Sequence, residues 1–498
     1  LFDHPGSFNP QYLHLADVSG TGATDIIYLG ENTFKAYINL SGNAWSDAHE
    51  IEPFFPIDGN TQLSVIDLLG TGTSCIAWSS DLPAFAEAPM RYIDLMAGKK
   101  PHLLVHYKNN FGKETTLQYK SSTHFYLEDK LAGKPWITKL PFPVQVISKQ
   151  IIEEKITDVR FTAEYRYHHG YYDHPEREFR GFGMVEQIDT EYYENWQANN
   201  DGNQLDSSEE LYQAPVLTKT WFHTGAFLDR ERILTQFKEE YWYEEYNRRF
   251  PTTPLTVTEP QLPDAVISDR LSAEEWPEAL RACKGMVLRR EVFSMDDPGN
   301  SDNKKQFKPY SAATHNCNIQ LLQPGAGNRH GVFLVTESEA ISIQYERDET
   351  DPRIAHTLNT KIDKLGNILE AASVVYPRLQ EDDSLPQATR TEQEKTLITY
   401  TRNTFTNDVI QPDAYRLRVI AETETFELND FPKSGTLYQL PDLNGVFGAG
   451  INPIDYQINL DTDPDPFPGA PKRRLIEHIR SLYYRYDLTA PLPPGVLE

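Results

Sequence analysis

The sequence has little cysteine and no long apolar run. Its three cysteines, Cys75, Cys283 and Cys317, are an odd number at wide spacing and contain no Cys-x-x-Cys pair. This pattern indicates neither a disulfide framework nor a zinc or redox motif. No window approaches the roughly 18 uninterrupted apolar residues that a transmembrane helix requires, and the mean hydropathy is -0.56. We therefore expect no insertion into a membrane.

Basic residues are also scarce. The chain has 47 Lys and Arg against 73 Asp and Glu, which gives a net charge of -26. Such a chain repels the phosphate backbone, so we expect no nucleic-acid partner. The start at Leu1 has no basic region and no apolar run of the kind found in a signal peptide, and we interpret it as cut from a longer chain.

Motifs of several enzyme classes are missing as well. We find no Gly-x-Ser-x-Gly, no Walker-type Gly-Lys-Ser/Thr, no His-Glu-x-x-His and no Gly-x-Gly-x-x-Gly after a strand. The residues that are abundant are 27 Tyr, 24 Phe and 34 Pro. Aromatic residues favour strands and prolines favour turns, so the composition predicts a mainly β fold.

An internal repeat is the first positive signal. Residues 15–22 read Leu-Ala-Asp-Val-Ser-Gly-Thr-Gly, and residues 65–72 read Val-Ile-Asp-Leu-Leu-Gly-Thr-Gly, so Asp17 recurs as Asp67 after 50 residues. Each copy predicts an apolar strand, a tight Gly-x-Gly turn and a second strand, and 34–40 supplies a third. This period is typical of propeller blades. Two blades cannot close a propeller, so we expect more of them upstream.

Beyond residue 85 the repeat stops and further strands follow. Residues 103–108 and 115–119 flank Asn-Asn-Phe-Gly and predict a hairpin. Other strands are predicted at 157–167, 331–335, 341–345 and 368–376. Helices are predicted at 227–249 and 273–289. Loops are predicted at 195–210, 296–308 and 380–393.

The first Gly-x-Gly turn is a candidate calcium site. Asp17, Ser19, Thr21 and Asp25 have the spacing of calcium loops in integrin-like (FG-GAP) propellers, where oxygen ligands recur at alternate positions. Hydroxyls replace two of the usual carboxylates or amides, which lowers the charge of the site. The second copy has Leu69 and Cys75 at ligand positions. An Asx-turn with glycines at positive φ explains both copies without an ion.

Two other groups have the residue types of active sites. His168, His169, Asp173 and His174 lie within seven residues, but adjacent side chains on a strand point to opposite faces. A strand end and turn is the alternative to a metal site. Glu337 with Glu339, and Glu422 with Glu424, form Glu-x-Glu pairs similar to those of ADP-ribosyltransferases. No Ser-Thr-Ser strand precedes either pair, and we name no catalytic residue.

Several longer segments resemble the B components of bacterial insecticidal toxin complexes, the SpvB-like and TcdB middle regions. The most specific are Tyr-Arg-Tyr-His-His-Gly-Tyr-Tyr-Asp at 165–173 and Glu-Arg-Glu-Phe-Arg-Gly-Phe-Gly-Met-Val-Glu at 176–186. Further segments resemble the same family in the same order: 91–95, 100–104, 136–144, 215–225, 284–291, 345–347, 351–356 and 363–369. Residues 363–367 are also similar to a single Rhs or YD repeat, with Ile362 in place of Tyr.

The resemblance implies a non-catalytic subunit. In that family the B component is part of a hollow Rhs-type β-shell around a toxic enzyme carried by a C component, and its propeller docks onto an A-component channel and gates release. The implied domains are the last propeller blades at 1–84, a shell region resembling the middle/N-terminal region at 85–250, and one resembling the middle/C-terminal region at 251–498. The implied location is extracellular, in a secreted complex, after cytoplasmic synthesis. No cofactor is expected apart from the calcium candidate.

Two other classes of function stay open at this point. One is a secreted glycan- or protein-binding propeller with an accessory β-domain. The other is an ADP-ribosyltransferase-like enzyme that would use one of the Glu-x-Glu pairs.

Overall fold

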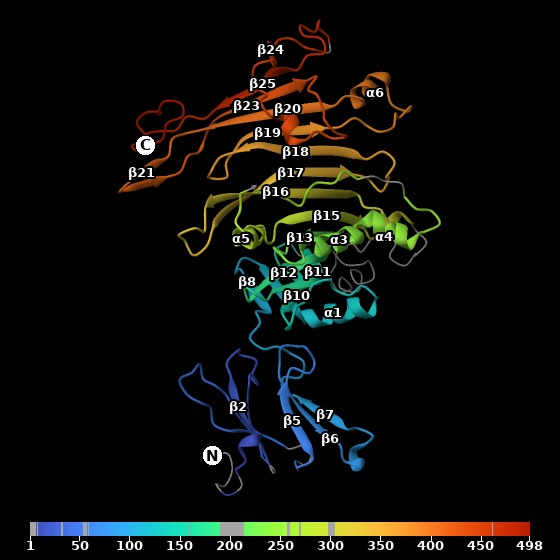
Figure 1. Cartoon of the computed structure of the whole chain (residues 1–498), viewed down its shortest axis with the longest axis vertical. Helices are drawn as coiled ribbons and strands as arrows, with labels where there is room; N and C mark the ends of the chain where they lie inside the picture. Colours follow the sequence, from blue (N-terminus) through green and yellow to red (C-terminus); the bar gives the residue numbers. More distant parts are fainter. Residues whose placement is uncertain are drawn as a thin grey trace. The chain divides into compact units, whose positions relative to one another are not determined.

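The computed structural model is mainly β and divides into two units, Leu1–Gln213 and Ala214–Glu498. It describes residues 6, 8–30, 33–52, 57, 59–157, 159–189, 214–255, 259–267, 270–296, 304–460 and 462–498. The predicted loop at 195–210 lies outside the described residues. Figure 1 shows the strands and helices of both units, and each unit is described below by itself.

The first unit begins with two small antiparallel sheets. One contains β1 (Leu13–Ala16), β2 (Asp25–Leu29), β3 (Phe34–Tyr37) and β4 (His49–Ile51), and the other contains β5 (Thr61–Ile66), β6 (Cys75–Ser80) and β7 (Met90–Asp94). Apolar side chains of both sheets share one core, which includes Ile27, Leu29, Phe34 and Ile76. The repeat therefore produces the strand, turn and strand units that its pattern predicts.

A larger antiparallel sheet follows in the same unit. Its strands succeed one another in chain order: β8 (His106–Lys108), β9 (Lys113–Ser121), β10 (Gln145–Glu154), β11 (Val159–Asp173) and β12 (Glu178–Asp189). The β8–β9 turn confirms the predicted hairpin, because Asn109 Oδ1 accepts hydrogen bonds from the Phe111 and Lys113 amides and Gly112 has φ +97°.

One helix packs against this sheet. The Ser121 hydroxyl caps α1 (Ser122–Leu131) by accepting from the Thr123 amide. Phe125 of α1 packs on Trp136 and Val146, and Tyr167 and Phe182 border that cluster. The sheet thus buries one face beneath a helix.

The second unit is built on a long, mainly antiparallel sheet. From β13 onward each strand lies beside the next in the order β13, β15, β16, β17, β18, β19, β20, β23, β25, β24, with β14 parallel to β16. The bounds are β13 (Val216–Phe222), β14 (Ala265–Ile267), β15 (Val287–Ser294), β16 (Ser311–Gln323), β17 (Val332–Gln344), β18 (Arg353–Ile362), β19 (Ile368–Val375), β20 (Leu397–Phe405), β23 (Ile420–Asn429), β24 (Asn452–Ile454) and β25 (Lys472–Arg480). A separate hairpin joins β21 (Val409–Gln411) to β22 (Ala414–Arg416).

The described residues of this unit form the α-helices α3 (Arg230–Glu240), α4 (Trp242–Arg249), α5 (Glu275–Ala282) and α6 (Gln387–Gln393). The first two confirm the helix predicted at 227–249, with a break at Tyr241. The helix predicted at 273–289 is wrong beyond Ala282, because Gly285 at φ +84° ends the helical run and Val287 begins β15.

Two other predictions differ from the structure. The loop predicted at 380–393 ends in α6, where Pro386 precedes a run of helix-forming residues. The strands predicted at 331–335 and 341–345 are one strand, β17. Its polar middle stays extended because β16 and β18 pair with it on both sides.

A buried ion cluster lies in the core of the second unit. The Arg289 guanidinium is 2.7 Å from Glu291 Oε1 and 2.8 Å from Glu259 Oε2. The Trp242 indole and the Tyr345 hydroxyl donate to Glu259 Oε1 at 2.7 and 2.6 Å. Burial raises the pKa of Glu291, while Arg289 opposes that shift. One cation therefore holds two carboxylates that have been removed from water.

Candidate functional site

The candidate calcium loop is closed by its own backbone. Asp17 accepts hydrogen bonds from the amides of Thr21 and Gly22 at 3.0 and 2.9 Å. Asp25 is fully buried and accepts from the amides of Val18, Ser19 and Asn39. The hydroxyls of Ser19 and Thr21 bond to each other at 3.1 Å.

The second turn has the same geometry without the ligand set. Asp67 accepts from the Thr71 and Gly72 amides at 2.9 and 2.8 Å, although Leu69 and Cys75 stand where the first copy has oxygen donors. Lys100 Nζ lies 3.7 Å from Asp17 Oδ2 and donates to the Gly72 carbonyl at 3.0 Å. An ammonium group therefore already neutralises the first turn, and calcium binding by Asp17, Ser19, Thr21 and Asp25 stays a prediction.

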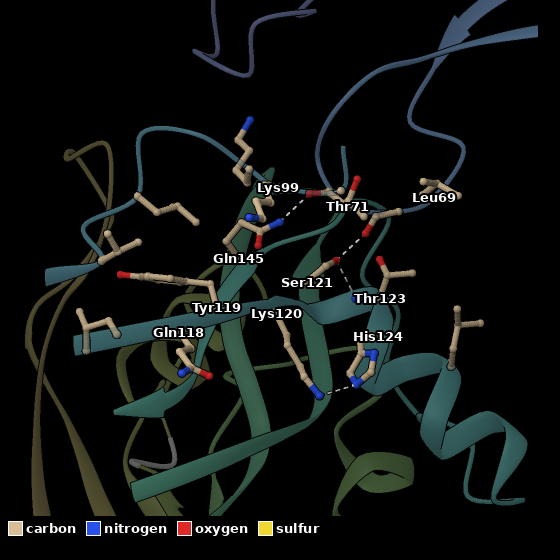
Figure 2. A pocket seen from close by; sticks show the side chains of 17 residues that line it. Leu69, Thr71, Lys99, Gln118, Tyr119, Lys120, Ser121, Thr123, His124 and Gln145 are labelled. Carbon is tan, nitrogen blue, oxygen red and sulfur yellow. Dashed lines mark hydrogen bonds between the residues drawn. The ribbon is translucent and has the colours of Figure 1, made fainter. Parts of the chain in front are cut away.

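A pocket of 510 Å³ lies where the second turn meets α1 and the β9–β10 end of the larger sheet (Figure 2). The Gln145 side chain donates to the Thr71 carbonyl at 2.6 Å, and the Ser121 hydroxyl donates to the Gly70 carbonyl. A Cβ at Gly70 would stand 2.6 Å from Thr123 Cγ2. The turn is therefore seated tightly on the start of α1.

The pocket lining is basic in an otherwise acidic chain. Lys99, Lys100, Lys120 and His124 line it, and no Asp or Glu does. Lys120 Nζ donates to His124 Nε2 at 2.9 Å, as Figure 2 shows, and Lys100 is engaged as described above. The pocket can attract anionic groups, but two of its cations already have partners within the chain.

The histidine-rich segment does not bring its imidazoles together. His168 Nδ1 donates to Asp129 Oδ2 at 2.7 Å, whereas His169 Nδ1 accepts from the Ile137 amide at 3.3 Å. His169 has a φ of +56°, and the β11–β12 register shifts just beyond it, between Gly170 and Tyr172. Burial lowers the pKa of His168, but the hydrogen bond to Asp129 and the nearby Glu186 carboxylate, 3.9 Å from Nε2, outweigh it and raise that pKa to about 9. The segment is the end of a strand, in which His168 pairs with Asp129.

The Glu-x-Glu carboxylates are engaged across neighbouring strands. Glu337 bonds to His315 at 2.6 Å, and Glu339 accepts from Asn316 at 3.2 Å. Glu422 pairs with His478 and Arg480, and Glu424 pairs with Arg402. These partners account for the acidic pairs as cross-strand contacts.

A group that sequence reasoning missed lies in the second unit. One ligand atom from each of His223, Cys283 and Cys317 lies within 4.8 Å of the others, and all three residues are buried. Among the residues that the structure describes, no other group of three His, Cys, Asp or Glu side chains has this geometry. Sixty and 34 residues separate the three positions, so no local motif could have revealed them.

Comparison with known families decides the affiliation. The model of the insecticide toxin TcdB middle/N-terminal region matches residues 57–225, and that of the TcdB middle/C-terminal region matches 278–419. Together they cover more than half of the chain. The chain belongs to the TcdB-like middle regions.

Solved structures agree with this affiliation. A Photorhabdus luminescens Tc holotoxin pore with a TccC3 mutant matches with a TM-score of 0.73 and 25% identity over 99% of this chain and 22% of that chain. The TcdB2–TccC3 crystal structure matches with a TM-score of 0.72 and 24% identity over the same shares. The chain thus spans about a fifth of the solved chains. A comparison with curated proteins gave no match.

The motifs that resemble the family have structural roles in this TcdB-like region. Residues 165–186 form most of the β11–β12 hairpin, inside which Arg180 is buried 3.3 Å from Asp173 and 3.2 Å from Glu178. Residues 284–291 contribute Arg289 and Glu291 to the buried ion cluster.

The Rhs-like turn links β18 to β19. Asp363 Oδ1 accepts from the amides of Leu365 and Asn367 at 2.9 Å, and Gly366 has φ +87°. The resemblance is therefore carried by residues that set the hairpins and the core.

No helix among the described residues is long and apolar enough to cross a membrane.

Proposed function

We propose that this TcdB-like region forms part of the wall of a hollow Rhs-type β-shell, and that the shell encloses a toxic enzyme carried by a C component. The observation that carries the proposal is the match to the TcdB2–TccC3 structures over 99% of the chain. That assembly contains a C component, and the holotoxin pore match supports an A-component partner.

The sheet of the second unit is consistent with this role. Its strands follow one another largely in chain order, and the pleat of each strand places alternate residues on opposite faces. Such a sheet extends in one direction without needing a closed core, which is what the wall of a container requires.

We further propose that residues 1–84 are blades of a propeller that docks onto the A-component channel and gates release. The two small antiparallel sheets and their repeated Asp-x-x-Gly-x-Gly turns support this assignment. The seat of Gly70 on α1 gives these sheets a defined attachment to the larger sheet of the same unit. This role implies that the protein acts outside the cell, as part of a secreted complex.

The same proposal assigns no catalysis to the chain. The carboxylates of both Glu-x-Glu pairs are engaged by His, Asn or Arg side chains of neighbouring strands. We expect the purified protein not to turn over NAD. NAD turnover by the wild type that is lost in both Glu339→Gln and Glu424→Gln would support the ADP-ribosyltransferase-like alternative instead.

Protease protection tests the container role. The full-length protein is coexpressed with a C component, and the purified complex is treated with a protease that digests the free cargo. We expect the cargo to survive in the complex and to be digested when the C component is expressed alone. Equal digestion in both samples would rule out enclosure.

A glycan array tests the alternative that the protein is a secreted binding protein. Specific glycan binding without a C component would support that alternative.

A further inference from the structure

Three elements of the second unit converge on the buried group of His223, Cys283 and Cys317. His223 directly follows β13, Cys283 caps the C-terminus of α5, and Cys317 lies within β16. All three side chains are at most 7% exposed. Cys317 is held within a strand, and His223 and Cys283 lie at the first position after a strand and a helix, so all three are anchored close to regular elements.

The imidazole is oriented as in metal-binding histidines. His223 Nε2 lies 3.0 Å from the backbone carbonyl of Asp264, and a carbonyl can only accept, so Nε2 donates. In the neutral ring the free lone pair is then on Nδ1. A hydrogen bond from the second ring nitrogen to a backbone carbonyl is the usual outer support of a metal-bound histidine.

The carbonyl that orients His223 is itself fixed. The Asp264 carboxylate is held by Arg230, whose Nε is 2.9 Å from Asp264 Oδ2. Asp264 immediately precedes β14, in which Ala265 lies opposite Cys317 in the register with β16. The same short segment therefore orients the imidazole and runs beside one of the two thiols.

The two sulfur atoms lie within 4.8 Å of each other, so both can reach one ion. The Cys283 thiol has its own alternative partner, the Leu280 carbonyl at 3.0 Å. Both cysteines also pack against Ala279 and Ile319, so ordinary core packing is the competing explanation.

Charge and space favour a divalent ion of the zinc type. Two thiolates and a neutral imidazole balance a charge of +2, which removes the cost of burying an unpaired ion. Sulfur and nitrogen ligands are those that zinc prefers. A cavity of 20 Å³ beside His223, Cys283 and Asp264 has room for about one water molecule as a fourth ligand. It has no room for an organic substrate.

We propose that His223, Cys283 and Cys317 bind one Zn²⁺ ion that ties the end of β13 to α5 and β16. The role is structural, and it is independent of the proposed container function, since a shell without the ion could still enclose cargo.

Metal analysis of variants tests this site. The full-length protein is purified under reducing conditions without chelators, and its zinc content is measured by mass spectrometry. We expect about one zinc per chain in the wild type and none in Cys283→Ser or Cys317→Ser. Cys75→Ser is the matched control, because Cys75 is a buried free cysteine of the other unit, and it should keep the metal.

Co²⁺ binding to the wild-type protein tests the site even if the cysteine variants do not fold. Co²⁺ is added to the chelator-treated protein, and thiolate-to-cobalt absorption is followed in the near ultraviolet before and after an excess of Zn²⁺. We expect absorption that appears with Co²⁺ and is abolished by Zn²⁺. Wild type that binds neither metal, a Cys283–Cys317 disulfide in the native protein, or full metal content in both cluster variants would overturn the proposal.

Discussion

Arg289 holds together the buried ion cluster of the second unit. Its guanidinium neutralises Glu259 and Glu291 in a site where all three side chains are at most 1% exposed. Removal of one partner from a buried ion cluster leaves the others charged and without solvent, which costs more than the loss of a surface pair.

We expect Arg289→Met to lower the free energy of unfolding by about 3–5 kcal/mol, because two buried carboxylates lose their cation. Arg290→Met is the matched control, since Arg290 is the next residue and is exposed. It should change the stability by about 0.5 kcal/mol or less. Urea denaturation of the two variants measures both values. Similar losses in both would contradict the assigned role of the cluster.

His168 provides a prediction of pH dependence. Its pKa is raised from 6.5 to about 9, so protonation stabilises the fold. This contribution is complete below about pH 6.5 and is lost as the pH rises through about 9, with an upper limit of about 3 kcal/mol. His168→Gln should remove this pH-dependent part, whereas the exposed His174→Gln should retain it. Stability curves of wild type and His168→Gln that run parallel from pH 6 to pH 10 would refute the prediction.

At the scale of elements, the Gly-x-Gly turns show what a local pattern determines. Both Asp residues accept hydrogen bonds from amides four and five positions later, so the turn geometry follows from a few adjacent residues. What differs between the turns is what they contact. Gly70 is seated on Thr123 and the equivalent Gly20 of the first turn on Pro101, whereas Gly22 has open space around it.

Gly70 and Gly22 together allow backbone strain to be separated from a steric clash. Both glycines have positive φ, so alanine at either position costs about 1 kcal/mol of stability. Gly70→Ala also clashes with Thr123 and should cost about 1–3 kcal/mol more. In a double-mutant cycle, Thr123→Ala should recover part of this extra loss. Thermal unfolding of the wild type, the three single variants and the double variant measures these losses, and equal losses at Gly70 and Gly22 would show that the turn is not seated on α1.

The limits of sequence reasoning also appear at this scale. Hairpins and turns could be predicted because their signals are local, as at Asn109 and Asp363. The continuity of β17 could not, because its polar middle is held extended by two neighbouring strands. Likewise, Arg289 and the group of His223, Cys283 and Cys317 are defined by burial and by contacts between distant segments, which neither periodicity nor spacing records.

At the scale of the whole molecule, the affiliation with TcdB-like middle regions supports the proposal that the long sheet is part of a container wall. The resemblance in sequence is carried by hairpin and core residues, and the solved relatives share the fold over 99% of the chain. A wall needs strands that continue from one to the next and a stable core beneath them. It does not need convergent catalytic side chains.

Imaging of the full-length protein with its C component tests this account most directly. Single-particle electron microscopy of the coexpressed complex should show the strands from β13 to β25 as part of a wall around a lumen that contains cargo density. Residues 1–84 should lie within a closed propeller. An open sheet with the cargo bound outside it would contradict the account.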